Sequence, residues 1–467
     1  MNKSDIIKFY RENAYKREQW NKRNRFYHRA LEKYFSFVIP PNKRVLELGC
    51  GSGNLLNAVK PEYGVGVDFA PEVIEIASMK YPDLHFKVDD VENLAINETF
   101  DYIILSDLLG NLWDAQAAIS NISKLCHRQT RIIISQYNFV WEPFIKFLEF
   151  AGLKQRQPNQ NWFSVMDVEN LLQLENFQTI NIVRKILIPA YIPVINLLFN
   201  TIIANLPLFN KLNLVSIITA RPLLPENQEV SVTIVIPARN EQGNIENAIK
   251  RMPVFGLRQE IIFIEGHSND DTYKEMFRVQ AAYPEKNIHV MKQTGKGKGN
   301  AVREGFEAAT GDVLMILDAD LTMPPEELPK FYEALRLGKG EFINGCRLVY
   351  PMEKHAMRFL NLIANKFFGW FFTFLLGQRL KDTLCGTKAL YRADYVAIKN
   401  NRSYFGDFDP FGDFDLLFGA AKLNLKITEM IIRYKERQYG TTQISRFKHG
   451  LLLIQMSLFA ARKLKFN

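Results

Sequence analysis

The sequence predicts an α/β protein with two domains. Two short apolar runs, within residues 44–53 and 232–241, each suit a strand buried on both faces of a parallel sheet and end abruptly in glycine or charged residues. Each run opens a series of strand-like and helix-length segments, and a chain of 467 residues exceeds what one hydrophobic core usually supports. Because open α/β sheets bind ligands at the carboxyl ends of their strands, we expect one binding site in each domain.

The first series is preceded by a basic amphipathic helix, predicted over residues 5–37. A helix that covers the first sheet is the simpler interpretation, and a basic surface for an anionic partner is the alternative. Strand-like runs then alternate with helix-length segments, which predicts a parallel sheet. These runs span residues 44–49, 63–68, 84–88, 100–106 and 130–136.

The domain boundaries follow from a polar stretch that proline breaks twice. This stretch, residues 221–229, is the best linker candidate in the chain. We therefore expect a first domain over residues 1–220 and a second domain over residues 230–440. Residues 441–467 form a basic amphipathic carboxyl-terminal segment in this division.

The composition of the chain restricts the possible classes of binding partner but does not identify one. Lys and Arg total 59 against 50 acidic residues, and the net charge of +9 suits anionic small molecules, a lipid surface or nucleic acid. The four cysteines lie far apart, so neither a disulfide framework nor a structural zinc site is indicated, and a reducing cytosol is the expected compartment. Residues 1–20 are charged and have no apolar core, which argues against a secretory signal.

Three apolar stretches suit contact with a membrane. Residues 186–210 lack charge over a length sufficient to span a bilayer, but prolines and asparagines interrupt them, which disfavours a span. Residues 359–376 fit an interfacial helix or a buried core helix. Residues 451–466 are apolar and then basic, a pattern that suits anionic lipid.

A glycine-rich turn marks the first candidate site. Gly49, Gly51 and Gly53 form a G-x-G-x-G turn directly after the first strand, where glycine lets the backbone approach a ligand that a Cβ would keep away. A dinucleotide fingerprint would need glycine at position 54, and this chain has Asn54. The turn alone is a weak signal, because such turns often only tighten the packing of strand and helix.

Three acidic residues accompany the turn. Glu47 precedes it, Asp68 ends the next strand, where a carboxylate can bind both hydroxyls of a ribose, and Asp89 follows the third strand. This combination resembles the class I S-adenosylmethionine (SAM)-dependent methyltransferases over roughly residues 1–220, which implies their Rossmann-like fold. The resemblance implies that Asp68 holds the ribose and that Asp89 approaches the adenine amine. Glu47 and the glycine turn would face the methionine part of SAM.

The sequence contains less information about the methyl acceptor than about SAM. Methyl transfer needs mainly proximity and orientation of an already reactive sulfonium, so its catalytic residues are often inconspicuous. Residues 106–107 and 136–138 follow the fourth and fifth strands, at the edge where an acceptor would lie. Ordinary loop residues are the simpler interpretation of both segments.

Two carboxylates mark the second candidate site. Asp318 and Asp320 end an apolar strand, where they can share a divalent ion that bridges a diphosphate. The D-x-D pattern is common by chance, but further motifs surround it in order, at residues 232–241, 261–272, 295–301, 324–326, 382–387 and 437–442. The ordered set resembles the family 2 inverting glycosyltransferases of GT-A fold, most closely the dolichyl- or polyprenyl-phosphate mannosyl- and glucosyltransferases, over about residues 230–450.

The resemblance implies a site for a nucleotide-diphosphate sugar and its metal. The donor-binding positions that it gives are Pro237, Arg239, Glu241, Glu265, Lys296, Lys298 and Asp318. Glu265 stands where the family usually has an aspartate for the base or ribose, and Gly266 replaces a second aspartate. For the two lysines, a solvated basic turn is the alternative to phosphate binding. Asp318 and Asp320 would hold Mg²⁺ or Mn²⁺, which stabilises the departing nucleoside diphosphate.

The acceptor side supplies three catalytic candidates, Asp413, Asp415 and Arg437. Asp415 falls where the family has a glutamate, and Arg437 matches the arginine of its R-x-x-G-x-S-K motif, in which Thr442 and Gln443 replace Ser-Lys. A hydroxyl acceptor needs a general base. A lipid phosphate is already largely dianionic and needs none, so Asp415 would then only orient the acceptor.

We therefore expect a fused enzyme, a SAM-dependent methyltransferase domain followed by a metal-dependent glycosyltransferase that glycosylates polyprenyl phosphate or a related glycan. We expect it in the cytoplasm, peripheral at the inner face of the cell membrane. The alternative is a glycosyltransferase whose first domain is a non-catalytic SAM-binding or scaffold module. Nucleic-acid methylation would suit the basic helix, but no recognisable nucleic-acid-binding module supports a nucleic-acid partner.

Overall fold

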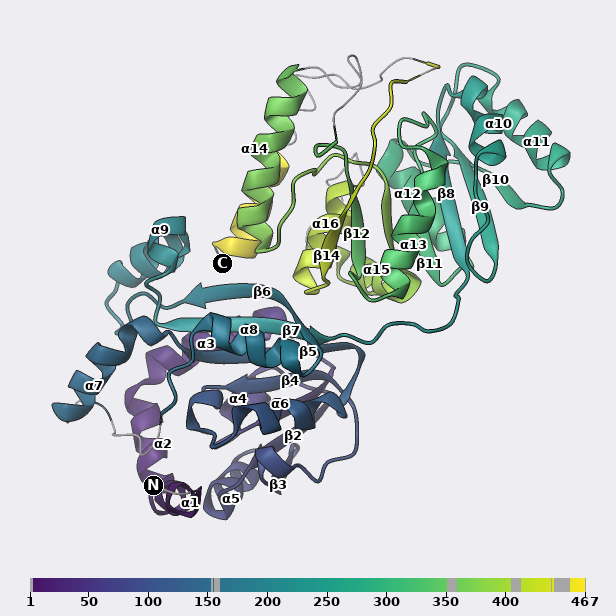
Figure 1. The fold of residues 1–467 in the computed structure, drawn as a ribbon. Coiled ribbons are helices and arrows are strands. Elements are labelled where there is room, and N and C mark those ends of the chain that lie inside the picture. Colours follow the sequence, from purple (N-terminus) through teal and green to yellow (C-terminus); the bar gives the residue numbers. More distant parts are fainter. Residues whose placement is uncertain are drawn as a thin grey trace. The chain divides into compact units, whose positions relative to one another are not determined.

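The chain divides into two compact units between Leu224 and Pro225 (Figure 1). The computed structural model describes residues 3–152, 154, 160–350, 359–404, 413–437, 439–440 and 454–466. Both units are α/β, which confirms the predicted class with two domains. The division falls within the expected linker, although Arg221 and Pro222 still belong to the last strand of the first unit.

The first unit contains a seven-stranded sheet in the order β3-β2-β1-β4-β5-β7-β6. Its strands are β1 (Arg44–Leu48), β2 (Tyr63–Asp68), β3 (His85–Val88), β4 (Phe100–Ser106), β5 (Cys126–Tyr137), β6 (Phe177–Lys185) and β7 (Val215–Pro222). The first five strands pair in parallel, as the alternation predicts. The sheet as a whole is mixed, because β7 runs antiparallel to both β5 and β6, two pairings that the sequence analysis missed.

Helices cover this sheet, and three of them replace the single helix expected at the amino terminus. The helices of the first unit are α1 (Lys3–Glu12), α2 (Ala14–Arg23), α3 (Arg25–Val38), α4 (Asn54–Ala58), α5 (Pro71–Lys80), α6 (Ala115–Ser123), α7 (Glu142–Phe150), α8 (Val165–Leu174) and α9 (Pro207–Asn210). The breaks fall at Asn13 and Asn24, in keeping with the tendency of Asn side chains to compete for backbone hydrogen bonds. Helix α3 buries Tyr27, Leu31 and Phe35 in a core shared with the sheet, so it covers the sheet as expected.

The second unit contains another seven-stranded sheet, in the order β10-β9-β8-β11-β13-β12-β14. Its strands are β8 (Val232–Ala238), β9 (Gln259–Glu265), β10 (Asn287–Lys292), β11 (Val313–Ile316), β12 (Phe342–Cys346), β13 (Lys388–Tyr391) and β14 (Ile427–Ile431). Its helices are α10 (Gln242–Lys250), α11 (Thr272–Ala282), α12 (Lys298–Ala308), α13 (Leu328–Arg336), α14 (Phe359–Leu376), α15 (Arg392–Asn400) and α16 (Asp413–Lys422). Strand β13 is antiparallel to both of its neighbours, β11 and β12.

The central strands of both sheets are apolar on both faces. Every residue of β11 is buried, and only Pro237 of β8 is partly exposed. Such strands tolerate charged groups only at their ends. The chemistry of each unit is therefore confined to the edge where the parallel strands end.

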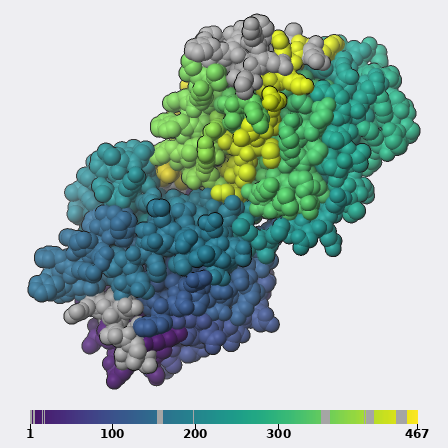
Figure 2. Space-filling model, viewed as in Figure 1, coloured from purple at the N-terminus to yellow at the C-terminus, as the bar shows by residue number. Residues whose placement is uncertain are grey.

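The apolar stretches lie partly at the surface. Among the described residues, no helix is both long and apolar enough to cross a membrane. Within residues 186–210 the chain forms only short helical turns and α9, and this region is exposed in Figure 2. Helix α14 is only partly a core helix, since Phe368 and Phe372 are buried while Phe367 and Trp370 are exposed. Of the expected carboxyl-terminal segment, residues 441–453 and 467 lie outside the described part of the chain.

Candidate active sites

The first site begins at the glycine turn after β1. Gly49, Gly51 and Gly53 all have positive φ angles, of 70°, 51° and 74°, which L side chains rarely adopt. A Cβ on Gly49 would meet Leu108 at 2.7 Å, and one on Gly53 would meet Phe86 at 2.6 Å. Nothing lies within 4 Å of the position of a Cβ on Gly51. The turn is therefore packed at its two ends and open at its centre, where a ligand can approach the backbone.

Asp68 and Asp89 lie beside one another at the same sheet edge. Asp68 is buried at the end of β2, where its carboxylate accepts hydrogen bonds from the N–H groups of Gly51 (3.2 Å) and Ala70 (3.1 Å). Asp89 donates its own N–H to the Asp68 carbonyl, and its carboxylate accepts hydrogen bonds from two N–H groups of its own loop. Asp68 thus holds the glycine turn in place, while Asp89 shapes the neighbouring loop.

Glu47 lies in β1, two residues before Gly49. Its side chain is buried and its Oε2 atom has no hydrogen-bond partner. Burial raises the pKa of the Glu47 carboxyl to about 8, and the nearby charge of Asp68 acts in the same direction. Glu47 therefore carries a proton at neutral pH in this state of the protein.

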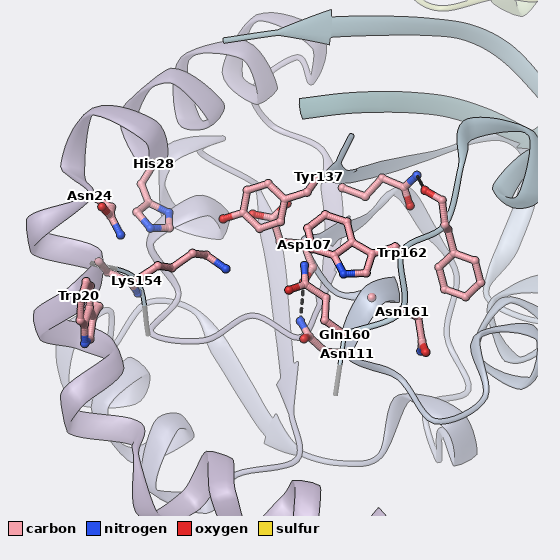
Figure 3. Close-up of a pocket in the computed structure, with 14 residues that line it drawn as sticks. Trp20, Asn24, His28, Asp107, Asn111, Tyr137, Lys154, Gln160, Asn161 and Trp162 are labelled. Atoms are coloured by element: carbon pink, nitrogen blue, oxygen red, sulfur yellow. Dashed lines mark hydrogen bonds between the residues drawn. The ribbon is translucent and has the colours of Figure 1, made fainter. Parts of the chain in front are cut away.

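A pocket lies beyond the ends of β4 and β5 in the first unit (Figure 3). It is lined by Trp20, Asn21, Asn24, His28, Asp107, Gly110, Asn111, Gln136, Tyr137, Lys154, Gln160, Asn161, Trp162 and Phe163. Leu108, whose side chain lies against Gly49, directly follows Asp107, which lines this pocket. Of the two segments singled out at these strand ends, Asp107, Gln136 and Tyr137 line the pocket. Ser106 and Asn138 do not, and Asn138 instead binds the carbonyls of residues 211 and 213.

The second site lies at the carboxyl edge of the second sheet. Asp318 follows β11 and forms an ion pair with Lys298, the first residue of α12, at 2.5 Å. The pair leaves no room for a side chain on Gly386, since a Cβ there would meet both charged groups at under 2.3 Å. Burial alone would raise the pKa of Asp318, but the Lys298 ammonium group holds it below its usual value.

Arg437 joins residues from three distant parts of the chain. Its guanidinium group contacts Asp320 at 2.7 Å and Glu241 at 2.7 Å. Glu241 is further held by the amide of Asn244, and Asp320 by the hydroxyl of Thr322. The structure thus brings together one residue from each predicted group: a donor-binding position, a metal-binding position and a catalytic candidate.

The remaining donor-side positions lie at the same edge. Pro237 and Arg239 are in and after β8, and Ala238 pairs with Glu265 at the end of β9. Glu265 is buried and accepts a hydrogen bond from the N–H of Ser268, so it shapes the loop after β9. Lys296 is exposed, in contrast to its neighbour Lys298.

Asp415 is bound by two arginines that the sequence analysis missed. Its carboxylate accepts a hydrogen bond from Arg402 at 2.8 Å and lies 3.9 Å from Arg303. Asp415 is buried, in α16, while the side chain of Asp413 lies outside the described residues. Thr442 and Gln443 also lie outside them. No local motif marks the two arginines, because Arg303 lies in α12 and Arg402 in the short helical turn after α15, and both meet Asp415 of α16 only in the folded chain.

The motif at residues 382–387 contributes one partner, Asp382, to another buried ion pair. Asp382 is fully buried and binds Arg347 through two hydrogen bonds, of 2.7 and 2.8 Å. Asn365 of α14 also donates a hydrogen bond to Asp382, at 3.1 Å. This network ties α14 to the strand β12, and the charge of Arg347 also lowers the pKa of Asp318.

Comparisons with known proteins divide the chain in the same way. Residues 233–397 match the family model described as glycosyl transferase family 2, and residues 19–182 match that of a methyltransferase domain. A dolichol-phosphate mannosyltransferase of Pyrococcus furiosus is 38% identical over 139 residues, which are 29% of this chain and 39% of that protein. An undecaprenyl-phosphate 4-deoxy-4-formamido-L-arabinose transferase of Klebsiella pneumoniae is 33% identical over 222 residues, which are 46% of this chain and 62% of that protein. The chain thus spans less than two thirds of both relatives.

Among solved structures, the magnesium protoporphyrin IX methyltransferase of Synechocystis, with bound SAH, is similar to the chain at 15% identity. The match covers 47% of this chain and 98% of that one, with a TM-score of 0.34.

Glu47→Gln should increase the stability of the first unit in a pH-dependent way. Folding raises the pKa of Glu47 to about 8, so the unfolded chain releases this proton at a lower pH than the folded protein does. The folded protein therefore loses stability as the pH rises from the ordinary carboxyl range to 8. Glutamine has no such cost, so we expect the free energy of unfolding of the variant to exceed that of the unaltered protein by about 3 kcal/mol at pH 7 and by almost nothing at pH 4.5.

Urea unfolding followed by tryptophan fluorescence measures this difference, since four of the five tryptophans lie in the first unit. Glu62→Gln, at an exposed position, is the control. A stability gain that is the same at both pH values would show that the carboxyl is not buried in its protonated form.

Proposed function

Because the chain carries a methyltransferase domain followed by a family 2 glycosyltransferase domain, we propose that it is a bifunctional enzyme. Its second domain transfers a sugar from a nucleotide-diphosphate donor to polyprenyl phosphate, and its first domain transfers a methyl group from SAM. The observation that carries the proposal is the contact of Arg437 with both Glu241 and Asp320, which gathers donor-side and acceptor-side positions at one sheet edge.

The donor would bind where carboxylates and cations alternate. Asp318 and Asp320 offer the hard oxygen ligands that Mg²⁺ and Mn²⁺ prefer, and each now faces a cation, Lys298 or Arg437. Among the described residues, no group of three or more His, Cys, Asp or Glu side chains gathers around a metal position. Magnesium is commonly held by one or two carboxylates together with substrate phosphates, so the two aspartates suffice as its protein ligands. A bound metal would offset the charge that develops on the leaving nucleoside diphosphate.

The acceptor would be a phosphate monoester rather than a hydroxyl. Arg303 and Arg402 provide planar guanidinium groups, which suit the oxygens of a phosphate. Asp415 is engaged by both arginines, an arrangement that suits a carboxylate which positions them more than one which removes a proton. A lipid phosphate needs no general base, which agrees with this arrangement.

A polyprenyl phosphate lies in a membrane, and we propose that the second unit docks at the inner face of the cell membrane. Helix α14 exposes Ile363, Phe367 and Trp370. The helical residues 454–460 expose further apolar side chains, and the basic turn at residues 461–465 that follows them packs against α14. An apolar face next to cations is the pattern of helices that lie in the interface of an anionic membrane.

The first domain would bind SAM at the glycine turn. The open space at Gly51 and the adjacent carboxylates of Asp68 and Asp89 support a ligand with a ribose and a base at this edge. Glu47, protonated in this state, would face the cationic methionine part and would then favour its charged form.

Asp320→Asn should abolish most sugar transfer. The substitution keeps the shape of the side chain but removes the charge that balances a divalent ion, so we expect kcat to fall at least about 10²-fold. Asp415→Asn should instead raise the KM for polyprenyl phosphate with a much smaller change in kcat. Donor consumption with Mn²⁺ and polyprenyl phosphate measures both, with the exposed Asp271→Asn as the control. Full activity of Asp320→Asn in the presence of a chelator would contradict the metal-dependent mechanism.

Asp68→Ala should lose SAM binding and keep sugar transfer. Two ribose hydroxyls would lose their acceptor and the glycine turn would lose a hydrogen bond, which together cost a few kcal/mol. Titration calorimetry measures the SAM affinity, with the exposed Asp83→Ala as the control. An unchanged affinity would show that the ribose does not bind at Asp68.

Replacing Ile363, Phe367 and Trp370 together by serine should release the protein from anionic vesicles. The exposed side chains would no longer bury apolar surface in the lipid, which is worth roughly 1.5–3 kcal/mol for each large side chain that is fully buried. Co-sedimentation at low salt measures binding, and raising the salt should weaken it in the unaltered protein. Val254→Ser with Leu257→Ser, two exposed apolar residues of a loop, is the matched control. The proposal is wrong if the unaltered protein never co-sediments at low salt.

A further inference from the structure

We propose that the pocket at the ends of β4 and β5 binds a neutral glycosyl residue and that one of its hydroxyls receives the methyl group. The inference rests on the proposed methyltransferase function of the first domain and adds the class of its acceptor. It also rests on the side chains that line the pocket, which are rich in amides and aromatic rings and have almost no net charge.

Side-chain amides dominate the polar lining. Six of the 14 lining residues carry one, namely Asn21, Asn24, Asn111, Gln136, Gln160 and Asn161. An amide offers a donor and an acceptor within one group, as a hydroxyl does, so a ring of amides suits a ligand with many hydroxyls. Three of the amides donate hydrogen bonds to backbone carbonyls, which fix their orientation. Asn111 donates to the carbonyl of Asp107 (2.9 Å), Gln136 to that of Phe163 (3.0 Å) and Asn161 to that of Leu112 (2.8 Å). Their orientation is thus set before any ligand arrives.

Aromatic rings supply the apolar part of the lining. Trp20 comes from α2, Tyr137 from the end of β5, and Trp162 and Phe163 from the loop before α8. In Figure 3, Tyr137 and Trp162 lie on one side of the pocket, while Trp20 and Asn24 approach from the helices on the other. A pyranose combines apolar C–H faces with a polar rim, so flat rings beside amides match it better than they match a purely apolar or a purely charged ligand.

The charges in the pocket disfavour an anionic acceptor. Among the described lining residues, Lys154 supplies the one ammonium group, Asp107 the one carboxylate and His28 an imidazole. Lys154 is paired with Glu149 at 3.2 Å and lies 5.2 Å from the centre of the Tyr137 ring. An anionic acceptor would have to compete with Glu149 for the charge of Lys154 and would also face the carboxylate of Asp107, which makes a neutral acceptor the better match.

Asp107 is held in an uncommon backbone conformation at the rim of the pocket. Its φ angle is 51°, and its N–H donates to the carbonyl of Ser135 at 2.9 Å. The hydroxyl of Tyr27 donates to its carboxylate at 2.7 Å, and that of Ser135 at 3.3 Å. Burial, together with the charge of Asp107, raises the pKa of Tyr27 well above its ordinary value, so Tyr27 remains a neutral donor. Strained residues held by several contacts are typical of functional sites.

Asp107 is also next to Leu108, which packs on Gly49 of the glycine turn. In the reaction, the acceptor hydroxyl oxygen attacks the methyl carbon of the sulfonium donor. The C–S bond breaks, and its electron pair stays on sulfur to give a neutral thioether. The hydroxyl proton passes to the Asp107 carboxylate, which leaves a methyl ether and SAH as the products.

The acceptor class can be tested with simple compounds on the full chain. The probes are methyl α-mannopyranoside and methyl α-glucopyranoside as neutral sugars, glucose 1-phosphate as an anionic sugar, and glucosamine as an amine. Methyl-labelled SAM is supplied, and transfer of the label is measured. We expect label on the hydroxyls of at least one neutral sugar and at least tenfold less on the anionic one. Label on the amine of glucosamine alone, or on none of the sugars, would overturn the proposal.

Two variants separate the acceptor site from the donor site. Trp162→Ala should weaken neutral-sugar binding at least tenfold, measured by fluorescence, while Trp113→Ala, at an exposed position outside the pocket, should leave it unchanged. Asp107→Asn should lower kcat at least about 10²-fold and keep sugar affinity, as expected of a lost general base.

SAM affinity is measured by calorimetry for each protein. If the unaltered chain does not bind SAM, the proposed methyltransferase function fails. If it binds SAM and Trp162→Ala loses no sugar affinity, only the acceptor assignment fails.

Discussion

The burial of the central strands on both faces is the constraint on which both sites depend. Strands β1, β4, β8 and β11 lie in the middle of their sheets and are almost entirely buried. A charged side chain within such a strand would lose its hydration without compensation, so charges and glycines collect where the strands end. In each unit, glycine and charged residues from distant parts of the sequence therefore meet at one edge of the sheet. The sequence motifs that supply these residues differ between the two units.

The carboxyl edge of the second sheet is organised by ion pairs between residues that are distant in the sequence. Asp318, Asp320 and Asp415 each meet a cation from another element, Lys298, Arg437 or Arg402. Removing one partner of such a buried or half-buried pair leaves the other charge uncompensated, which is costly. In the proposed function, the phosphates of the donor and the metal ion would exchange partners with these pairs, so a charged donor would bind without leaving an unpaired charge. The carboxyl edge of the first sheet is different, since Asp68 and Asp89 are held mainly by backbone N–H groups.

The sequence was sufficient for the features that depend on local pattern. The two domains, the parallel strands and the positions of Gly49, Asp68 and Asp318 follow from apolar runs that end in glycine or acid, and the structure has them at the sheet edges. It was insufficient for partners that meet only through packing. Arg303 and Arg402 are single cations on helices whose faces cannot be aligned before the helices are packed. Likewise, the helix break at Asn24 separates the pocket-lining residues of α2 from His28 of α3, and a basic amphipathic pattern does not reveal this break.

One measurement tests most directly whether a single chain joins the two chemistries. The full-length protein is incubated with polyprenyl phosphate, Mn²⁺, methyl-labelled SAM, a neutral methyl glycoside and a panel of UDP-, GDP- and dTDP-sugars labelled with a second isotope, and the lipid fraction is separated from the free sugars. We expect at least one donor to yield a lipid that carries the sugar label, while the same sample transfers the methyl label to the neutral glycoside. A protein that binds SAM and labels only one of the two products would contradict the proposal that both chemistries reside in this chain.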